Sequence, residues 1–223
     1  MSLAGTTNPN VIVLGGGRDT AFADAGNYFF AMTPTPGTGI ISGGSVQAFT
    51  ETTPYLVLYN GNVGGGPNIY PMFMRTHVTV VGATAGVALF YTFTLDTGNR
   101  YTSGGTALTI ANTNMANANS SLATINVGAI TASAASGSRR VVEHVKVKDT
   151  VVPVVHDTIV FTWGSPSGTP TSSVAGNSTT PTYTSVSLCP MVIGPGQSMV
   201  VVRWGASNTT GETNEFQLGF IEK

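Results

Sequence analysis

Charge is what this sequence has least of. Only 9% of the 223 residues are Asp, Glu, Lys or Arg, where an average globular protein has about a quarter. The net charge of −1 gives no field that would steer the chain to nucleic acid or to an acidic membrane, so we expect neither as a partner. Such a surface relies little on charge repulsion for solubility, which hints that other subunits cover part of it.

Disulfides, targeting signals and membrane spans are also missing from the pattern. The single cysteine, Cys189, allows no intrachain disulfide and lies in an apolar run, where we expect a buried, inert thiol. Residues 1–10 have neither a basic segment nor a long apolar core, so we predict no secretory signal. No apolar run approaches the roughly 20 residues that a membrane-spanning helix needs.

Long amphipathic helices are absent as well. No segment keeps a helical period over three turns, and strands do not alternate with helices. The sequence instead holds about a dozen short β-type runs between Gly- and Pro-rich turns. We predict an all-β, antiparallel β-sandwich of jelly-roll type with a short N-terminal arm at residues 1–10. Residues 1–40 would form the arm and first strands, and residues 41–223 the sandwich.

The expected strands follow from β-branched and aromatic runs bounded by turn residues. They cover residues 11–14, 28–32, 45–50, 55–59, 69–81, 87–95, 107–110, 122–130, 139–147, 151–163, 186–193, 198–204 and 215–222. Residues 18–27 allow a helical turn, residues 98–105 predict a turn, and residues 164–184 form the longest stretch without predicted structure.

The segment 191–223 has the clearest pattern. A Gly-Pro-Gly turn joins two apolar runs, and a polar loop follows the second. Phe216, Leu218 and Phe220 then share one face of a last strand. The pattern predicts a strand, a tight turn, a second strand, a loop and a closing strand, in an antiparallel sheet whose final strand completes the fold.

Motifs for catalysis or cofactor binding are not found. No serine stands in a GxSxG turn, and no pair of carboxylates suggests an acid and a base. The glycines at 15–17 open no βαβ unit, so we interpret them as a turn. His77, His144 and His156 have no metal-binding spacing and are best explained as surface or cross-strand histidines. A metal site assembled across strands stays open, because spacing along the chain does not report it.

The densest charge lies between residues 139 and 149. In a strand, His144, Lys146 and Lys148 would share one face, opposite two valines. One interpretation is a basic row, extended by Arg139 and Arg140, that contacts an acidic partner subunit or a polyanion. The other is an exposed strand whose lysines guard a sheet edge. A nucleic-acid site would need stacking aromatic side chains nearby, and the sequence predicts none there.

Trp163 precedes the long loop and has two interpretations. It is either a core residue or part of a small sugar-binding shelf. The candidate partner contacts are therefore Arg139, Arg140, His144, Lys146, Lys148 and Trp163.

Two stretches resemble a known group of proteins. Residues 101–130 contain a Gly-Gly-Thr-Ala-Leu-Thr strand, an Asn-rich crossing and an Ala-Thr-Ile run, and residues 193–198 form an Ile-x-Pro-Gly-Gln-Ser hairpin before a strand closed by Glu222. Together they resemble the small jelly-roll virion proteins of tailed bacteriophages, a group with capsid decoration, head-fibre and spike proteins. The resemblance covers about a third of the chain and implies a trimer without catalytic residues or cofactors.

Three functions follow as hypotheses. The first is a non-enzymatic virion protein that contacts its own copies and a major capsid or other virion protein. The second is a carbohydrate- or receptor-binding module of a phage fibre or tail, with its site near Trp163 and the loop 164–184. The third, a hydrolase on a β-sandwich, has no motif to support it.

Overall fold

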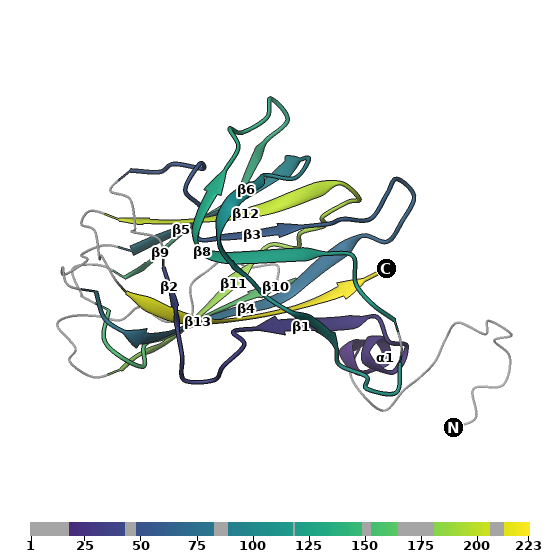
Figure 1. The fold of residues 1–223 in the computed structure, drawn as a ribbon, viewed down its shortest axis with the longest axis horizontal. Coiled ribbons are helices and arrows are strands. Elements are labelled where there is room, and N and C mark those ends of the chain that lie inside the picture. Colours follow the sequence, from purple (N-terminus) through teal and green to yellow (C-terminus); the bar gives the residue numbers. More distant parts are fainter. Residues whose placement is uncertain are drawn as a thin grey trace, which may run out of the picture.

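The computed structural model describes residues 18–42, 48–82, 89–117, 119–148, 153–164, 181–205 and 212–223. These residues form one short helix and two packed sheets of seven and six strands, as predicted for a β-sandwich (Figure 1). The predicted arm, the predicted strand at 11–14 and most of the predicted loop at 164–184 lie outside the described residues. The part of the chain that is described contains no helix long enough to cross a membrane.

The elements are short and follow one another closely along the chain. They are α1 (Arg18–Asp24), β1 (Tyr28–Met32), β2 (Ile40–Ile41), β3 (Leu56–Tyr59), β4 (Ile69–Val80), β5 (Leu89–Thr97), β6 (Tyr101–Ala107), β7 (Ile110–Asn112), β8 (Thr124–Ala132), β9 (Arg140–Lys148), β10 (Thr158–Trp163), β11 (Tyr183–Leu188), β12 (Gln197–Gly205) and β13 (Thr213–Glu222). The helix lies where the sequence allowed a helical turn.

Strand order shows how the chain winds through the two sheets. Sheet A has the order β11-β10-β4-β13-β1-β7, with β2 also paired to β13, and sheet B has the order β6-β8-β3-β12-β5-β9. Eight strands pair antiparallel as a nested set: β1 with β13, β3 with β12, β4 with β10, and β5 with β9. A long hairpin rolled across two sheets has this nesting, which is the jelly-roll topology.

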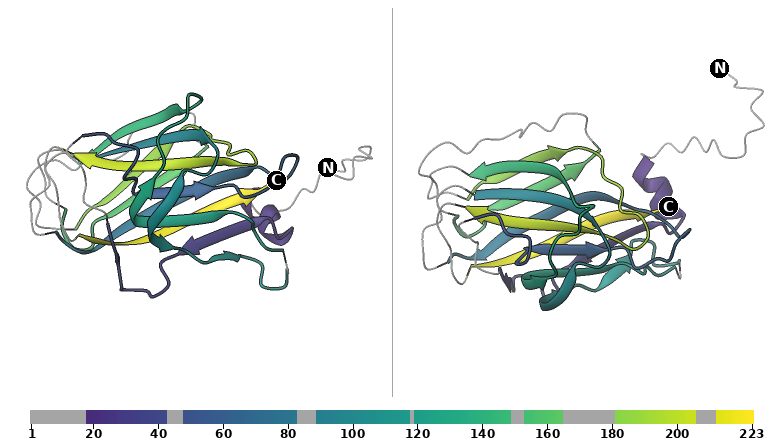
Figure 2. Two further views of the ribbon diagram at one scale, coloured as in Figure 1. Left: turned by 45° about the horizontal axis from the view of Figure 1, so that its top comes forward. Right: turned by 90° about the horizontal axis from the view of Figure 1, so that it is seen from above.

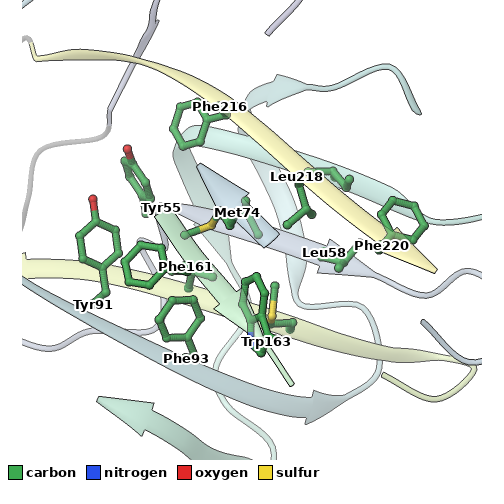
Figure 3. Close-up of a cluster of buried hydrophobic side chains, with 14 of the residues drawn as sticks. Tyr55, Leu58, Met74, Tyr91, Phe93, Phe161, Trp163, Phe216, Leu218 and Phe220 are labelled. Carbon is green, nitrogen blue, oxygen red and sulfur yellow. The ribbon is translucent and has the colours of Figure 1, made fainter. Parts of the chain in front are cut away.

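Aromatic side chains fill the space between the sheets (Figure 3). Phe161 of sheet A lies against Tyr91 and Phe93 of sheet B, with ring centroids 4.9 and 5.1 Å apart. Phe93 also meets the ring of Trp163 edge-on, at 5.7 Å. Such pairs add about 0.5–1.5 kcal/mol each beyond the apolar area that they bury. β5 and β10 therefore contribute a cluster of aromatic contacts to the core that joins the two sheets.

The last strand confirms the alternation predicted for it. Phe216, Leu218 and Phe220 point into the core and are at most 2% exposed. The prediction that these last strands share one antiparallel sheet is wrong, however, because β12 belongs to sheet B and β13 to sheet A. Each strand already has two neighbours in its own sheet, β3 and β5 for β12, and β4 and β1 for β13.

Several other predicted boundaries are also wrong. The turn expected at 98–105 contains most of β6, whose Gly104 and Gly105 have positive φ beside a register shift. Glycines that open a bulge in a strand resemble turn glycines in the sequence. No strand forms at residues 48–50, and the strand expected at 107–110 is the end of β6 and the start of β7.

The region on either side of β10 differs from the prediction as well. β10 begins only at Thr158, because residues 153–157 form a turn closed by a hydrogen bond from Asp157 N to Val154 O. β11 begins at Tyr183, inside the segment expected to lack structure, and pairs with β10 in parallel. The sandwich is thus antiparallel apart from this pair.

Strands β6 and β8 (teal) form one edge of sheet B, next to β3 (Figure 2). On the outer face of the sheet, Ile130 of β8 and Tyr101 of β6 pack with Val57, Val200 and Val202, none of which points to the main core. The three valines have no exposed surface. Sheet B therefore has a hydrophobic layer on both of its faces.

Candidate interaction surface

The predicted basic row lies on β9, the edge strand of sheet B in the described part of the chain. Val145 and Val147 are buried in the core, at 4% and 5% exposure. His144 and Lys146 are exposed on the opposite face, as the alternation predicted. Lys148 ends the strand, but its side chain lies outside the described residues.

The two arginines before this row differ in their contacts. Arg139 Nε lies 3.0 Å from Oε2 of Glu51, a carboxylate that is 8% exposed. Arg140 is exposed at the first position of β9, opposite Leu95 of β5. Arg139 is thus engaged inside its own chain, and the predicted partner contact rests more on Arg140.

Three aromatic rings form a platform next to the basic row. Phe90 of β5, Trp204 of β12 and His144 of β9 lie on neighbouring strands of sheet B, with pairwise ring centroids 4.6, 5.3 and 5.4 Å apart. Their planes are within 21° of parallel, so each ring lies at stacking distance from both others. The Nζ of Lys146 lies 5.8 Å from the centroid of the Phe90 ring.

A buried threonine fixes this aromatic platform. Trp204 Nε1 donates a hydrogen bond to Thr92 Oγ1 at 2.9 Å. The same oxygen lies 2.9 Å from Nδ1 of His144. Thr92 is only 4% exposed, so the indole and the imidazole are both tied to the same rigid point on β5. The aromatic platform is a preformed surface feature.

The prediction that no stacking aromatic side chains lie near the basic row is therefore wrong. Phe90 and Trp204 are half-buried on the outer face of sheet B. They come from β5 and β12, far from β9 in sequence. Alternation could not have found Trp204, because β12 carries buried apolar residues on both of its faces.

Trp163 is a core residue and not an exposed shelf. Its side chain is 7% exposed, so no ring face is open for a sugar to stack on. It nevertheless lines a cavity of about 630 Å³ together with Tyr70, Met72 and Lys223, among others. The buried indole Nε1 has no hydrogen-bond partner among the described residues.

Much of the sparse charge is engaged inside the fold. Asp96 Oδ2 lies 2.6 Å from Arg100 Nη1, and both residues are buried, at 4% and 2% exposure. Arg203 Nη2 lies 2.8 Å from the carboxylate of Glu212, which is also buried. With the pair of Arg139 and Glu51, three ion pairs engage six of the nineteen charged residues.

Apolar side chains are exposed on sheet A around Thr213, the first residue of β13. Thr213 pairs with Ile41 of β2 on one side and with Val80 of β4 on the other. Ile41, Val80 and the adjoining Val81 are 61%, 52% and 40% exposed. We call these three residues the apolar patch. Clustered exposed apolar residues are typical of a surface that another molecule covers.

The described residues contain no group of three His, Cys, Asp or Glu side chains that is placed to hold a metal ion. Cys189 is half-buried rather than fully buried, and its thiol lies 3.9 Å from the carbonyl oxygen of Val142. Burial, and then the nearby Glu143 carboxylate, raise the pKa of the Cys189 thiol. A thiol that stays protonated is a weak nucleophile.

Comparison with protein-family models, with curated proteins and with solved structures finds no match to this chain. What the structure defines is therefore the class of the fold, a β-sandwich with jelly-roll strand order.

Proposed function

We propose that this protein is a non-enzymatic structural protein of a bacteriophage virion, of the capsid decoration or minor virion type. It acts as a homotrimer and through contacts with a capsid or other virion protein. The family part of this proposal comes from the sequence resemblance of residues 101–130 and 193–198. The subunit-contact part comes from the surface chemistry of the fold.

The distribution of charged and apolar side chains is the observation that carries the proposal. Ion pairs that usually lie at a surface are buried here, and the apolar patch is exposed instead. Burying such a patch between subunits is favourable by about 25 cal/mol per Å² of apolar area. Interfaces of obligate oligomers often bury more than about 2,000 Å² in total.

The mass of the purified protein in solution tests the subunit contacts. We expect light scattering to give the mass of three chains, unchanged on dilution. The double variant Ile41→Lys, Val80→Lys should reduce the mass to one chain, because two lysines in an apolar interface cannot be solvated. Val63→Lys is the matched control, since Val63 is 80% exposed and lies in a separate turn. A wild-type monomer would contradict the proposed trimer.

Attachment to a virion needs its own test. We expect the protein to sediment with purified phage capsids, and a variant without residues 1–10 to sediment less while keeping its thermal unfolding temperature. Equal sedimentation of the wild type and the truncated variant would show that residues 1–10 do not contribute to the capsid contact. Absence of sedimentation for both would contradict a capsid location.

A carbohydrate- or receptor-binding module is the second candidate. The cavity beside Trp163 favours it, because a buried indole N–H without a partner can donate to a ligand hydroxyl. Glycan-array binding that is lost in Trp163→Phe and kept in Trp204→Phe would support this candidate. The phenylalanine keeps most of the ring packing and removes only the N–H donor and part of the ring.

A further inference from the structure

Two histidines far apart in the sequence meet on the outer face of sheet A. His77 lies on β4, and His156 lies in the turn before β10. Nε2 of His77 and Nδ1 of His156 are 3.4 Å apart, and the ring centroids are 5.4 Å apart. The two nitrogens therefore face each other, at a separation longer than a good N–H···N hydrogen bond.

The hydrogen bonds of His77 leave Nε2 as the nitrogen with a free lone pair. Thr158 Oγ1 donates to the carbonyl oxygen of His156 at 3.3 Å, so its single proton is engaged there. The same oxygen lies 2.9 Å from His77 Nδ1 and accepts the Nδ1 proton. Metal-bound histidines are usually held by such a hydrogen bond on the other ring nitrogen, which fixes the tautomer and the ring.

His156 is held in an uncommon backbone conformation that brings its ring over β4. Its φ is 75°, a value that costs a non-glycine residue on the order of 1 kcal/mol. Its backbone N–H donates to Val78 O at 2.8 Å, which ties the turn to β4.

The buried carboxylate of Asp157 supports this turn from within. It accepts hydrogen bonds from Val154 N at 2.8 Å and from Thr182 N and Oγ1 at 2.8 and 2.7 Å. Asp157 is 2% exposed, so the position of His156 does not depend on solvent-exposed contacts. The ring of His77 and the backbone of His156 are therefore placed before any ligand arrives.

We infer that His77 Nε2 and His156 Nδ1 chelate a divalent transition-metal ion, of the class that imidazole prefers, such as Zn²⁺, Cu²⁺ or Ni²⁺. Two nitrogens that each lie about 2.0–2.1 Å from a tetrahedral Zn²⁺ are about 3.4 Å apart, the separation seen here. Hard ions such as Mg²⁺ and Ca²⁺ do not fit, because they require oxygen ligands. Water completes the coordination, since no third protein ligand joins the pair among the described residues.

Two side chains of opposite charge lie near the site, so we expect the imidazoles to determine its affinity for the metal ion. Glu215 lies directly opposite His77 across β4 and β13, and Arg75 lies on the same face of β4. Both line a cavity of about 270 Å³ with His77 and Thr158. The carboxylate attracts a cation and the guanidinium repels it. The inference does not rest on the virion function proposed above.

The chain has three histidines, and the third provides a matched control. Metal-free, untagged full-length protein is titrated with Zn²⁺ by isothermal calorimetry, and we expect one ion per chain. His156→Asn should lower the affinity at least tenfold, and Asn tolerates the positive φ so that the turn is kept. His77→Gln should do the same, while His144→Asn, on the aromatic platform of sheet B, should leave the affinity unchanged.

Circular dichroism melting of each variant shows whether it is folded. If the His77→Gln variant is unfolded, the Zn²⁺ affinity of the His156→Asn variant alone tests the inference. The inference is overturned when the wild type takes up no Zn²⁺, when His156→Asn binds as tightly as the wild type, or when His144→Asn loses the same affinity.

Discussion

On the outer face of sheet A most side chains are exposed or half-buried, whereas in the middle of the outer face of sheet B they are fully buried. Arg75 and His77 of β4 and Gln217 of β13 are exposed or half-exposed on sheet A. Val200 and Val202 on sheet B have no exposed surface. The two sheets share one core, so the difference arises from what lies outside each of them.

The cause is a piece of chain inserted between β5 and β9. Ile130 of β8 and Tyr101 of β6, at the edge of sheet B, pack over its outer face, and Arg100 in the turn between β5 and β6 pairs with Asp96. Among the described residues, the outer face of sheet A has no such second hydrophobic cluster. A face that is covered by its own chain can hold buried charge, and the buried ion pair of Asp96 and Arg100 is an example. The low exposed charge of the molecule is thus partly a consequence of topology.

The largest expected difference between the two faces comes from a buried and an exposed arginine. Arg100→Met should lower the free energy of unfolding by about 3–5 kcal/mol, because it leaves the Asp96 carboxylate without its buried counter-ion. It also removes the donors to the carbonyl oxygens of Ser133 and Glu51. Arg75→Met on sheet A should change it by at most about 0.5 kcal/mol. Urea unfolding followed by circular dichroism measures both, and equal losses would refute the contrast.

A second comparison uses valines of the same size on the two faces. Val200→Ala on sheet B removes two methyl groups from a fully buried site and should cost about 2 kcal/mol. Val160→Ala on β10 of sheet A removes them from a half-buried site and should cost less than half as much. The same unfolding experiment separates the two. A loss at Val160 as large as that at Val200 would mean that the outer face of sheet A is covered in solution, as a subunit contact would do.

The contrast also explains which parts of the fold the sequence could predict. On β13 apolar and polar residues alternate, so the inward face with Phe216 and Leu218 was predictable. On β12, Met199 and Val201 point to the main core while Val200 and Val202 point to the second layer, and no alternation is left to assign Trp204. Periodicity reports a face only when the other face meets water.

The candidate site was predictable to the same extent. The basic row on β9 lies within one strand, and local alternation placed His144 and Lys146 on one face. The rest of the aromatic platform comes from β5 and β12, and the partner of His77 comes from the turn before β10. Contacts between distant strands depend on strand order and register, which spacing along the chain does not carry.

The smallest expected effect is a pair of opposite pH dependences of the free energy of unfolding. Each comes from one carboxylate, Asp96 on sheet B and Glu222 on sheet A. At Asp96 on sheet B, burial alone would raise the pKa, but hydrogen bonds from Ser136, Arg100 and Thr97 outweigh it and hold the pKa below its usual range. At Glu222, the end of β13 in sheet A, burial raises the pKa and the hydrogen bond from Ser121 opposes it only in part.

The signs of the two contributions follow from which state of the protein holds the proton more tightly. The unfolded chain protonates Asp96 more readily, so its stabilisation is present above the usual pKa of about 4 and is lost as the pH falls through the lowered value. The folded chain protonates Glu222 more readily, so its contribution is present below about 4 and is lost as the pH rises through the raised value. Asp96→Asn should therefore reduce the loss of unfolding free energy as the pH falls below about 4. Glu222→Gln should reduce the loss of unfolding free energy as the pH rises above about 4. Urea unfolding at a series of pH values measures both slopes, and a Glu222→Gln variant that changes only the acid limb would show that its carboxylate is ionised and stabilised in the fold, as Asp96 is.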